Sequence, residues 1–346
     1  MKYSLLGNTD IKVSKLCLGT MTFGEQNTET QAHEQLDYAL ERGINFIDTA
    51  EIYAVPCRKA TYGKTEEFIG TWIRARKNRD KYILASKVSG PSPYMAKYIR
   101  EDLGFSRRAI REAIQKSLTR LQTDYLDLYQ LHWPERQSPR FGKRYYQHDA
   151  EWEDNFSDII LTLNELKKEG KIRHYGLSNE TPWGTMRHLH TCDILKAGRP
   201  VSIQNPYSLT NRTFEYGLSE VAIRENVGLL AYSPLGMGML TGKYSNGTAT
   251  EDSRLNKFSS SWPRYRGINA LPAANKYHAL AQEHGLSTAQ MALAFVNTRP
   301  FLTSNIFGAT NMAQLKENID SIDVKLSEDV LKGIEEINEM YPNATP

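Results

Sequence analysis

The sequence predicts a closed (β/α)8 barrel, an α/β fold in which eight parallel strands each precede a helix. Three observations lead to this prediction. Short apolar, β-rich runs alternate with longer amphipathic segments, eight of each. The runs are almost continuously apolar, as expected for parallel strands that are covered on both faces. Eight regular units favour closure into a TIM barrel over the alternative, an open doubly wound sheet.

The strands are expected, in order, at residues 16–20, 44–49, 82–88, 125–132, 172–178, 201–207, 227–233 and 301–309. The helices are expected at 29–42, 65–77, 107–121, 156–169, 182–195, 215–225, 273–284 and 312–319. Ser106 precedes the third helix as an N-cap, because its hydroxyl can accept from a free backbone N–H. Gly43 and Gly170 stand where helices should end.

Four segments exceed this repeat. Residues 1–15 predict an N-terminal hairpin that plugs the bottom of the barrel. Residues 133–155 and 236–270 are long loops after strands four and seven, and such insertions belong at the C-terminal face of a barrel. Residues from about 327 to 340 predict an extra C-terminal helix packed outside. Without a linker or repeat, we expect residues 1–346 to form one domain.

Composition excludes several classes of protein. The chain has 346 residues, 40% hydrophobic and 24% charged, which is too apolar for a disordered protein. No apolar run reaches the roughly 18 residues of a membrane span, and the N-terminus lacks a signal-peptide core. A net charge of +3 predicts no nucleic-acid partner, and three dispersed cysteines predict a reducing, cytoplasmic location. The sequence carries no signal for an oligomeric state.

Two further motifs are rejected. The glycines from Gly236 to Gly242 have the wrong spacing for a dinucleotide fingerprint or a P-loop. His188, His190 and Cys192 are possible metal ligands. On a helix only His188 and Cys192 share a face, and two ligands are too few, so no metal site is expected.

Polar residues stand at the C-terminal ends of consecutive strands. Asp48 ends strand two, Tyr53 follows it, Lys87 ends strand three and His132 ends strand four. In a barrel these ends converge on one mouth, and the group suits proton transfer to or from a carbonyl oxygen. A neighbouring ammonium lowers the pKa of a phenol, a carboxylate orients the lysine, and an imidazole can donate to the substrate oxygen. Hydride transfer from a bound cofactor is the natural partner reaction; a hydrolase or lyase with a Lys87 Schiff base is the alternative.

The chain resembles the aldo-keto reductase family over nearly its whole length. The matching segments occur in family order: LCLGTMTFG, GINFIDTAEIY, YGKTEEFIG, ILASKV, RLQTDYLDLYQLHWP, IRHYGLSN, IQNPYS, LAYSPLGMGMLTGKY and FGATNMAQLKEN. Within the family it is most similar to bacterial reductases of the Tas type, which resemble the β subunits of voltage-gated potassium channels.

The resemblance implies a role for each strand-end residue. Tyr53 would be the general acid, Lys87 would lower its pKa, Asp48 would pair with Lys87, and His132 would orient the carbonyl. The substrate would contact Tyr53, His132 and Trp133. The implied cofactor-binding residues are Gly19, Thr20, Met21, Asp48, Ser178, Asn179, Gln204, Tyr232, Ser233, Pro234, Leu235, Gly236, Lys243, Gly308, Ala309, Thr310, Gln314, Glu317 and Asn318.

One departure from the family bears on the cofactor. Many members carry a basic pair where this chain has Gly308 and Gln314. A 2′-phosphate would therefore rely on Thr310, Gln314 and Lys243, and that single charge favours NADPH over NADH. The resemblance thus implies an NADPH-dependent oxidoreductase acting on a small aldehyde or ketone. The alternative is a cofactor-binding regulatory subunit of low turnover, as the channel subunits suggest.

Overall fold

Eight parallel strands close into a barrel in the computed structural model, which describes residues 1–92 and 98–346. In sequence order the barrel strands are β3 (Leu16–Gly19), β4 (Phe46–Asp48), β5 (Ile83–Val88), β6 (Leu126–Leu131), β7 (Ile172–Ser178), β8 (Ser202–Pro206), β9 (Gly228–Tyr232) and β10 (Leu302–Phe307). Strand β10 pairs in parallel with both β3 and β9, which closes the ring. The predicted barrel is therefore confirmed, and the open sheet is excluded.

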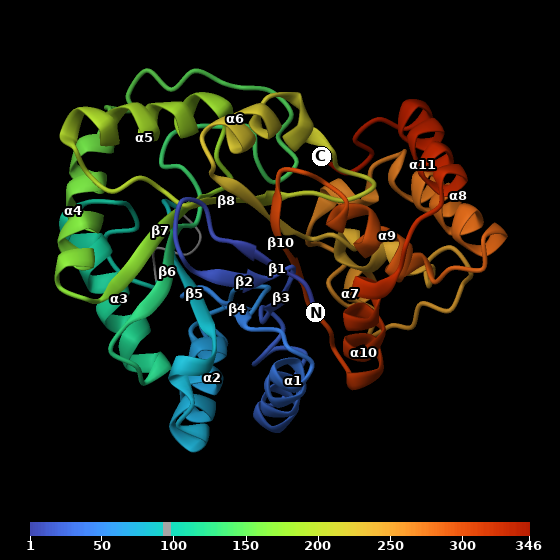
Figure 1. Ribbon diagram of the computed structural model, residues 1–346, viewed down its shortest axis with the longest axis horizontal. Coiled ribbons are helices and arrows are strands. Elements are labelled where there is room, and N and C mark those ends of the chain that lie inside the picture. Colours follow the sequence, from blue (N-terminus) through green and yellow to red (C-terminus); the bar gives the residue numbers. More distant parts are fainter. Residues whose placement is uncertain (93–97) are drawn as a thin grey trace.

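Helices surround the strands (Figure 1). Those that follow the first six barrel strands are α1 (Glu29–Glu41), α2 (Lys64–Arg76), α3 (Arg107–Leu121), α4 (Phe156–Lys168), α5 (Pro182–Leu195) and α6 (Leu218–Arg224). The predicted cap of α3 is present, since the Ser106 side chain accepts a hydrogen bond from the backbone N–H of Ala109. Gly43 and Gly170 follow α1 and α4 with φ of 81° and 74°, a backbone conformation that favours glycine.

The connection between β9 and β10 differs from the prediction of a single helix at 273–284. It holds the short α7 (Arg254–Lys257), then α8 (Ala270–Glu283) and α9 (Thr288–Asn297), and α9 packs on β10. Helix α9 was missed because apolar side chains occupy almost all of its faces, which leaves no amphipathic period to detect. The predicted helix at 215–225 is also shorter, because Gly217 with φ of 152° separates a 3-10 turn (Thr213–Tyr216) from α6.

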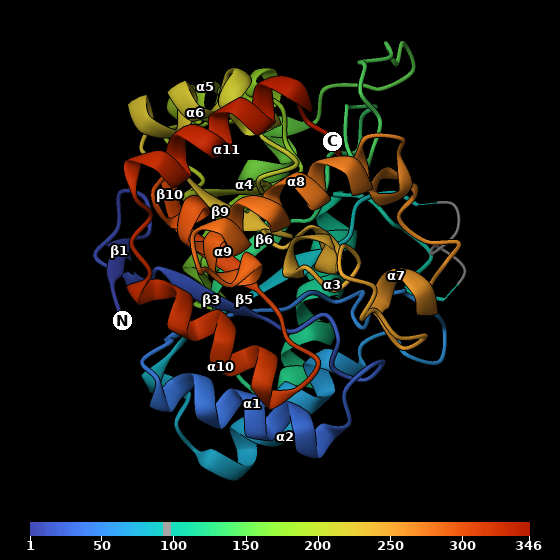
Figure 2. The same ribbon diagram turned by 90° about the vertical axis from the view of Figure 1, so that its right-hand side faces the viewer.

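After β10, α10 (Met312–Asp320) precedes the predicted extra helix, α11 (Glu328–Met340). Helix α11 packs on α8, and the two lie side by side on the outside of the molecule (Figures 1 and 2). Helix α8 therefore belongs to this outer layer, while α9 covers the barrel.

The two ends of the barrel are closed differently. Strands β1 (Tyr3–Leu5) and β2 (Lys12–Ser14) form the predicted antiparallel hairpin, and the neighbouring Leu6 is buried with Val13, Cys17 and Phe46 in one apolar cluster. The hairpin therefore seals the N-terminal end. The long loops lie on the opposite side, where Figure 2 shows α7 and the projecting green segment of residues 133–155. The cavity described below opens at this end.

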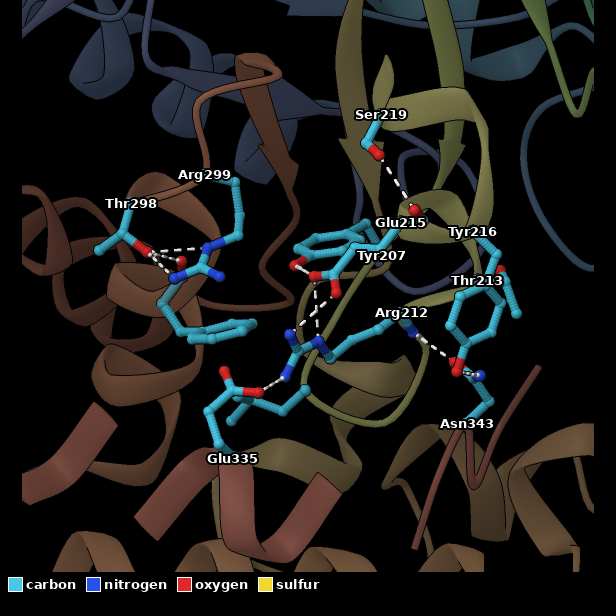
Figure 3. Close-up of polar contacts among 12 residues, drawn as sticks. Tyr207, Arg212, Thr213, Glu215, Tyr216, Ser219, Thr298, Arg299, Glu335 and Asn343 are labelled. Carbon is cyan, nitrogen blue, oxygen red and sulfur yellow. Dashed lines mark hydrogen bonds and ion pairs between the residues drawn. The ribbon is translucent and has the colours of Figure 1, made fainter. Parts of the chain in front are cut away.

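An ion cluster fastens α11 to the rim of the barrel (Figure 3). Arg212, in the loop after β8, lies 2.8 Å from the carboxylate of Glu215 and 2.7 Å from that of Glu335 on α11. The backbone N–H of Arg212 also donates to the side chain of Asn343, at 2.7 Å. Helix α11 thus stabilises the loop between β8 and α6.

Candidate active site

The carboxyl ends of the strands open into a cavity of about 620 Å³. Most residues that the sequence predicted for the site line it: Gly19, Thr20, Met21, Asp48, Tyr53, His132, Trp133, Ser178, Asn179, Gln204, Tyr232, Ser233, Pro234, Leu235, Lys243, Gly308, Ala309, Thr310, Gln314, Glu317 and Asn318. Two of the predicted residues, Lys87 and Gly236, are not among the lining residues. Lys87 lies behind the wall and Gly236 is buried near Thr210.

Lys87 is the centre of the polar network beneath the cavity. Its side chain is fully buried, and its three ammonium donors reach three acceptors. These acceptors are Asp48 Oδ2 at 2.6 Å, the carbonyl oxygen of Thr49 at 2.8 Å and the Tyr53 hydroxyl at 3.3 Å. Burial lowers the pKa of the ammonium, but the charges of Asp48 and then Tyr53 outweigh it, so the pKa is raised. Lys87 is therefore held as a cation against the phenol.

The second carboxylate oxygen of Asp48 is held by two amides. Gln204 Nε2 donates to Oδ1 at 2.8 Å and Gln130 Nε2 donates at 3.1 Å. With Lys87 on the other oxygen, the carboxylate is fully engaged, as a buried charge must be. Gln130 was missed by the sequence reasoning, although a glutamine inside the apolar strand β6 is the kind of buried polar residue that marks an internal partner.

Tyr53 presents its hydroxyl between the network and the cavity. Burial raises the pKa of this phenol, the Lys87 ammonium lowers it, and the Asp48 carboxylate raises it again. The net direction is upward. The expected lowering by Lys87 is therefore real but smaller than the cost of burying a phenolate, and the phenol is firmly protonated at neutral pH.

His132 lines the cavity next to Tyr53. The two rings meet edge to face with centroids 5.9 Å apart. Burial lowers the pKa of the imidazole well below 6.5, and the positive charge of Lys87 adds to this effect. The ring is thus neutral at physiological pH, and a neutral ring carries one N–H donor. Within the described residues its buried Nδ1 atom has no hydrogen-bond partner.

Beyond His132, the ends of β7 and β9 form a second chain of hydrogen bonds. The Tyr232 hydroxyl donates to Asn179 Oδ1 at 2.7 Å, and Asn179 Nδ2 donates to the carbonyl of His132 at 2.8 Å. Asn179 and Ser233 have φ of 53° and 55°, in the left-handed region that side chains rarely adopt. Such strain collects where a functional geometry is imposed.

Part of the cavity lining is cationic. Lys243 and Arg254 both line it, and no Asp or Glu of the described residues pairs with either. Burial lowers the pKa of Arg254 to about 10, and burial together with the charge of Arg254 lowers that of Lys243. Nearby, Gln314 Oε1 accepts from the N–H and the hydroxyl of Thr310, both at 3.0 Å.

Two partly buried cations without a counter-ion suit an anionic ligand, because attraction to an anion would offset the free-energy cost of removing these cations from water. Arg254 was not predicted, since nothing in the aperiodic loop 236–270 marks it out. Its place depends on Gln26, a distant residue whose Oε1 accepts from Arg254 Nε at 3.1 Å.

A barrel with this arrangement at its mouth defines an oxidoreductase of the aldo-keto type, and the chain belongs to that family. The family model described as "Aldo/keto reductase family" matches residues 15–339. "Protein tas" of Escherichia coli strain K12 is 51% identical over the full length of both chains. "Uncharacterized oxidoreductase YrpG" of Bacillus subtilis is 32% identical, covering 99% of this chain and 96% of its own. "Probable voltage-gated potassium channel subunit beta" of Arabidopsis thaliana is 29% identical, covering 99% and 98%.

Members of this family generally use NAD(P)H, and the predicted resemblance is confirmed. Within residues 1–92 and 98–346, every helix is too short or too polar to cross a membrane. The same residues bring together no group of three or more His, Cys, Asp or Glu side chains suited to a metal ion.

Proposed function

We propose that the protein reduces aldehydes or ketones to alcohols with NADPH. The observation that carries the proposal is the buried Asp48–Lys87 ion pair, which holds a cation 3.3 Å from the hydroxyl of Tyr53 at the cavity wall. A phenol next to a fixed ammonium can release its proton to an oxygen that is gaining negative charge. His132 would share that oxygen through its neutral N–H donor.

The cavity supports NADPH as the cofactor. The group formed by Ser178, Asn179, Gln204 and Tyr232 would hold the nicotinamide end, and the lining residues of 233–235 and 308–318 would hold the rest. Lys243 and Arg254, two lining cations without an acidic partner among the described residues, would bind a 2′-phosphate, which favours NADPH over NADH. When bound, the reduced nicotinamide supplies the hydride that reaches the carbonyl carbon.

In the proposed reaction the side chains manage the proton. As the C=O double bond is lost, the oxygen takes the proton of Tyr53, and the phenolate that remains is stabilised by Lys87 at 3.3 Å. Solvent then restores the phenol. Lys87 itself is a poor candidate for a Schiff base, because its three donors are engaged and its pKa is raised.

The test is a Tyr53→Phe variant assayed by NADPH absorbance with a panel of simple aldehydes. Loss of the general acid should lower kcat by about 10²- to 10⁴-fold, with NADPH affinity retained. The matched control is Tyr62→Phe, which removes a hydroxyl that contacts Arg120 outside the cavity lining and should leave kcat unchanged. Undiminished turnover in the Tyr53 variant rejects the assigned acid. Tight NADPH binding without turnover of any carbonyl would favour the regulatory alternative instead.

Two further expectations complete the proposal. We propose that residues 1–346 form one domain, supported by the family match over 15–339 and by the packing of the hairpin and α11 on the barrel. We also propose a cytoplasmic location, supported by three cysteines that are all free thiols.

A further inference from the structure

Arg264 lies at the mouth of the cavity and takes no part in the reaction proposed above. It belongs to a 3-10 turn (Pro263–Arg266) in the long loop after β9 and is a lining residue of the cavity. Its Nη1 atom is buried, yet this atom has no hydrogen-bond partner among the described residues. A buried guanidinium donor without an acceptor is costly unless something else supplies one.

The chain offers no counter-ion for Arg264 within the described residues. The acidic side chains that line the cavity are Asp48, Asp252 and Glu317. Each has another partner: Asp48 binds Lys87, Asp252 pairs with Lys257 and Glu317 accepts from the Ser287 hydroxyl. Arg264 is instead flanked by phenols, with the Tyr265 ring centroid 5.0 Å from its guanidinium carbon.

The position of Arg264 relates it to the reacting end of the cavity. Arg264, Tyr232 and Tyr53 all line the cavity, and the Arg264 guanidinium is close enough to the Tyr232 hydroxyl to act on the pKa of that phenol. The Arg264 side chain also lies near Gly142 in the loop after β6, since a Cβ added at Gly142 would come within 3.3 Å of Arg264 Cβ. Trp133, Phe141 and Trp262 also line the cavity, and the first two rings meet edge to face at 6.1 Å. Arg264 and these aromatic side chains therefore line the same cavity as Tyr53 and His132.

We propose that Arg264 determines substrate specificity by binding a negatively charged group, such as a carboxylate, at the end of the carbonyl substrate remote from the reacting carbon. A guanidinium matches a carboxylate in charge and geometry, and the aromatic walls suit an apolar spacer between the two ends. A site built to hydrogen-bond such a group discriminates against analogues that lack it. This inference rests on the proposed reductase function and names the substrate class that it prefers.

The experiment compares 4-carboxybenzaldehyde with its neutral methyl ester, methyl 4-formylbenzoate, in the wild type and in Arg264→Met and Arg264→Lys variants. For the acid, Arg264→Met should raise KM about tenfold to a hundredfold, as expected for loss of one charge-assisted contact, with kcat within about threefold. For the ester, KM should change less than about threefold. Arg264→Lys keeps the charge and should restore most of the preference for the acid.

The control for the general positive potential of the mouth is Arg144→Met, an exposed residue of the neighbouring loop. It should leave the preference for the acid intact. A binding measurement that needs no turnover accompanies the kinetics: calorimetry of 4-(hydroxymethyl)benzoate and its methyl ester with each NADPH-loaded protein, in which the alcohols have no hydride acceptor. The acid should bind the wild type at least tenfold more tightly than the ester does. The Arg264→Met variant should bind both ligands with the same weak affinity.

Several results would overturn the inference. If Arg264→Met impairs the reduction of acid and ester equally, the residue has a structural role only. If Arg144→Met reduces the preference for the acid as much as Arg264→Met does, the preference comes from the general positive potential of the mouth. A loss of NADPH affinity in Arg264→Met with the acid preference unchanged would assign the guanidinium to the cofactor. If the wild type reduces both aldehydes without preference, the proposed specificity is refuted and the reductase function is upheld. Arg264-dependent binding of the acid without any turnover would uphold the anion site and refute the proposed reductase.

Discussion

Replacing Lys87 with Met tests the buried ion pair directly. The variant keeps the volume of the side chain but leaves the Asp48 carboxylate buried without its ammonium. At 2.6 Å and an effective dielectric constant of about 20, the lost attraction is about 6 kcal/mol. Part of this is offset because Lys87 no longer has to be desolvated, so we expect the free energy of unfolding to fall by about 3–5 kcal/mol at pH 8.

The same argument predicts a pH dependence with a definite sign. In the variant, a proton on Asp48 removes the stranded charge, whereas in the unfolded chain an aspartate releases its proton near pH 4. The folded variant therefore binds a proton that the unfolded chain does not, and its stability falls as the pH rises. We expect the destabilisation to be smaller at pH 5.5 than at pH 8.

The assay is guanidinium unfolding at both pH values, for the wild type, Lys87→Met and the double variant Asp48→Asn with Lys87→Met. The double variant carries no stranded carboxylate, so at pH 8 it should be more stable than Lys87→Met alone and should lack the additional pH dependence. A destabilisation by Lys87→Met that is the same at both pH values, or a double variant no more stable than the single one, would refute the reasoning.

Three other predictions concern the ionisable side chains Arg254, His132 and Arg212. Arg254→Met should weaken NADPH binding about tenfold or more and leave NADH binding unchanged, as fluorescence titration would measure. Because burial keeps the pKa of His132 far below 6.5, the rate of carbonyl reduction should show no step near pH 6.5; a step there that disappears in His132→Gln would contradict this. Arg212→Met should lower the free energy of unfolding by about 2 kcal/mol, since Arg212 is nearly buried while its partner Glu335 is half exposed (Figure 3). Arg224→Met, which breaks an exposed pair, should cost less than about 0.5 kcal/mol in the same denaturant titration.

The family relationship also bears on the interpretation of these experiments. Similar sequences occur in a protein named as an oxidoreductase and in one named as a probable potassium channel subunit. Activity therefore has to be argued from the site rather than from the fold. Here the Tyr53 hydroxyl, the Lys87 ammonium and the neutral His132 ring lie together, which is why the reductase is the better supported proposal.

Some of the site follows from sequence because the fold is so regular. Once eight strands are expected to be parallel, their C-terminal ends must share one face, so Asp48, Lys87 and His132 can be placed together without coordinates. The N-terminal hairpin and α11 could be foreseen in the same way, because each has a local pattern of its own. Helix α9 could not, because its buried, uniformly apolar sequence lacks the period that marks a surface helix.

The sequence alone therefore determined the barrel, the order of its strands and the strand-end residues Asp48, Lys87 and His132 that meet at its mouth, since all three depend on short-range periodicity and on the direction of parallel strands. Only the tertiary structure decided the charge state of the Tyr53 phenol, the two amides that hold Asp48, and the places of Arg254 and Arg264. These depend on burial and on contacts between residues far apart in the chain, such as Arg254 with Gln26. Periodicity contains no information about which loop residues will be buried together or left without a partner.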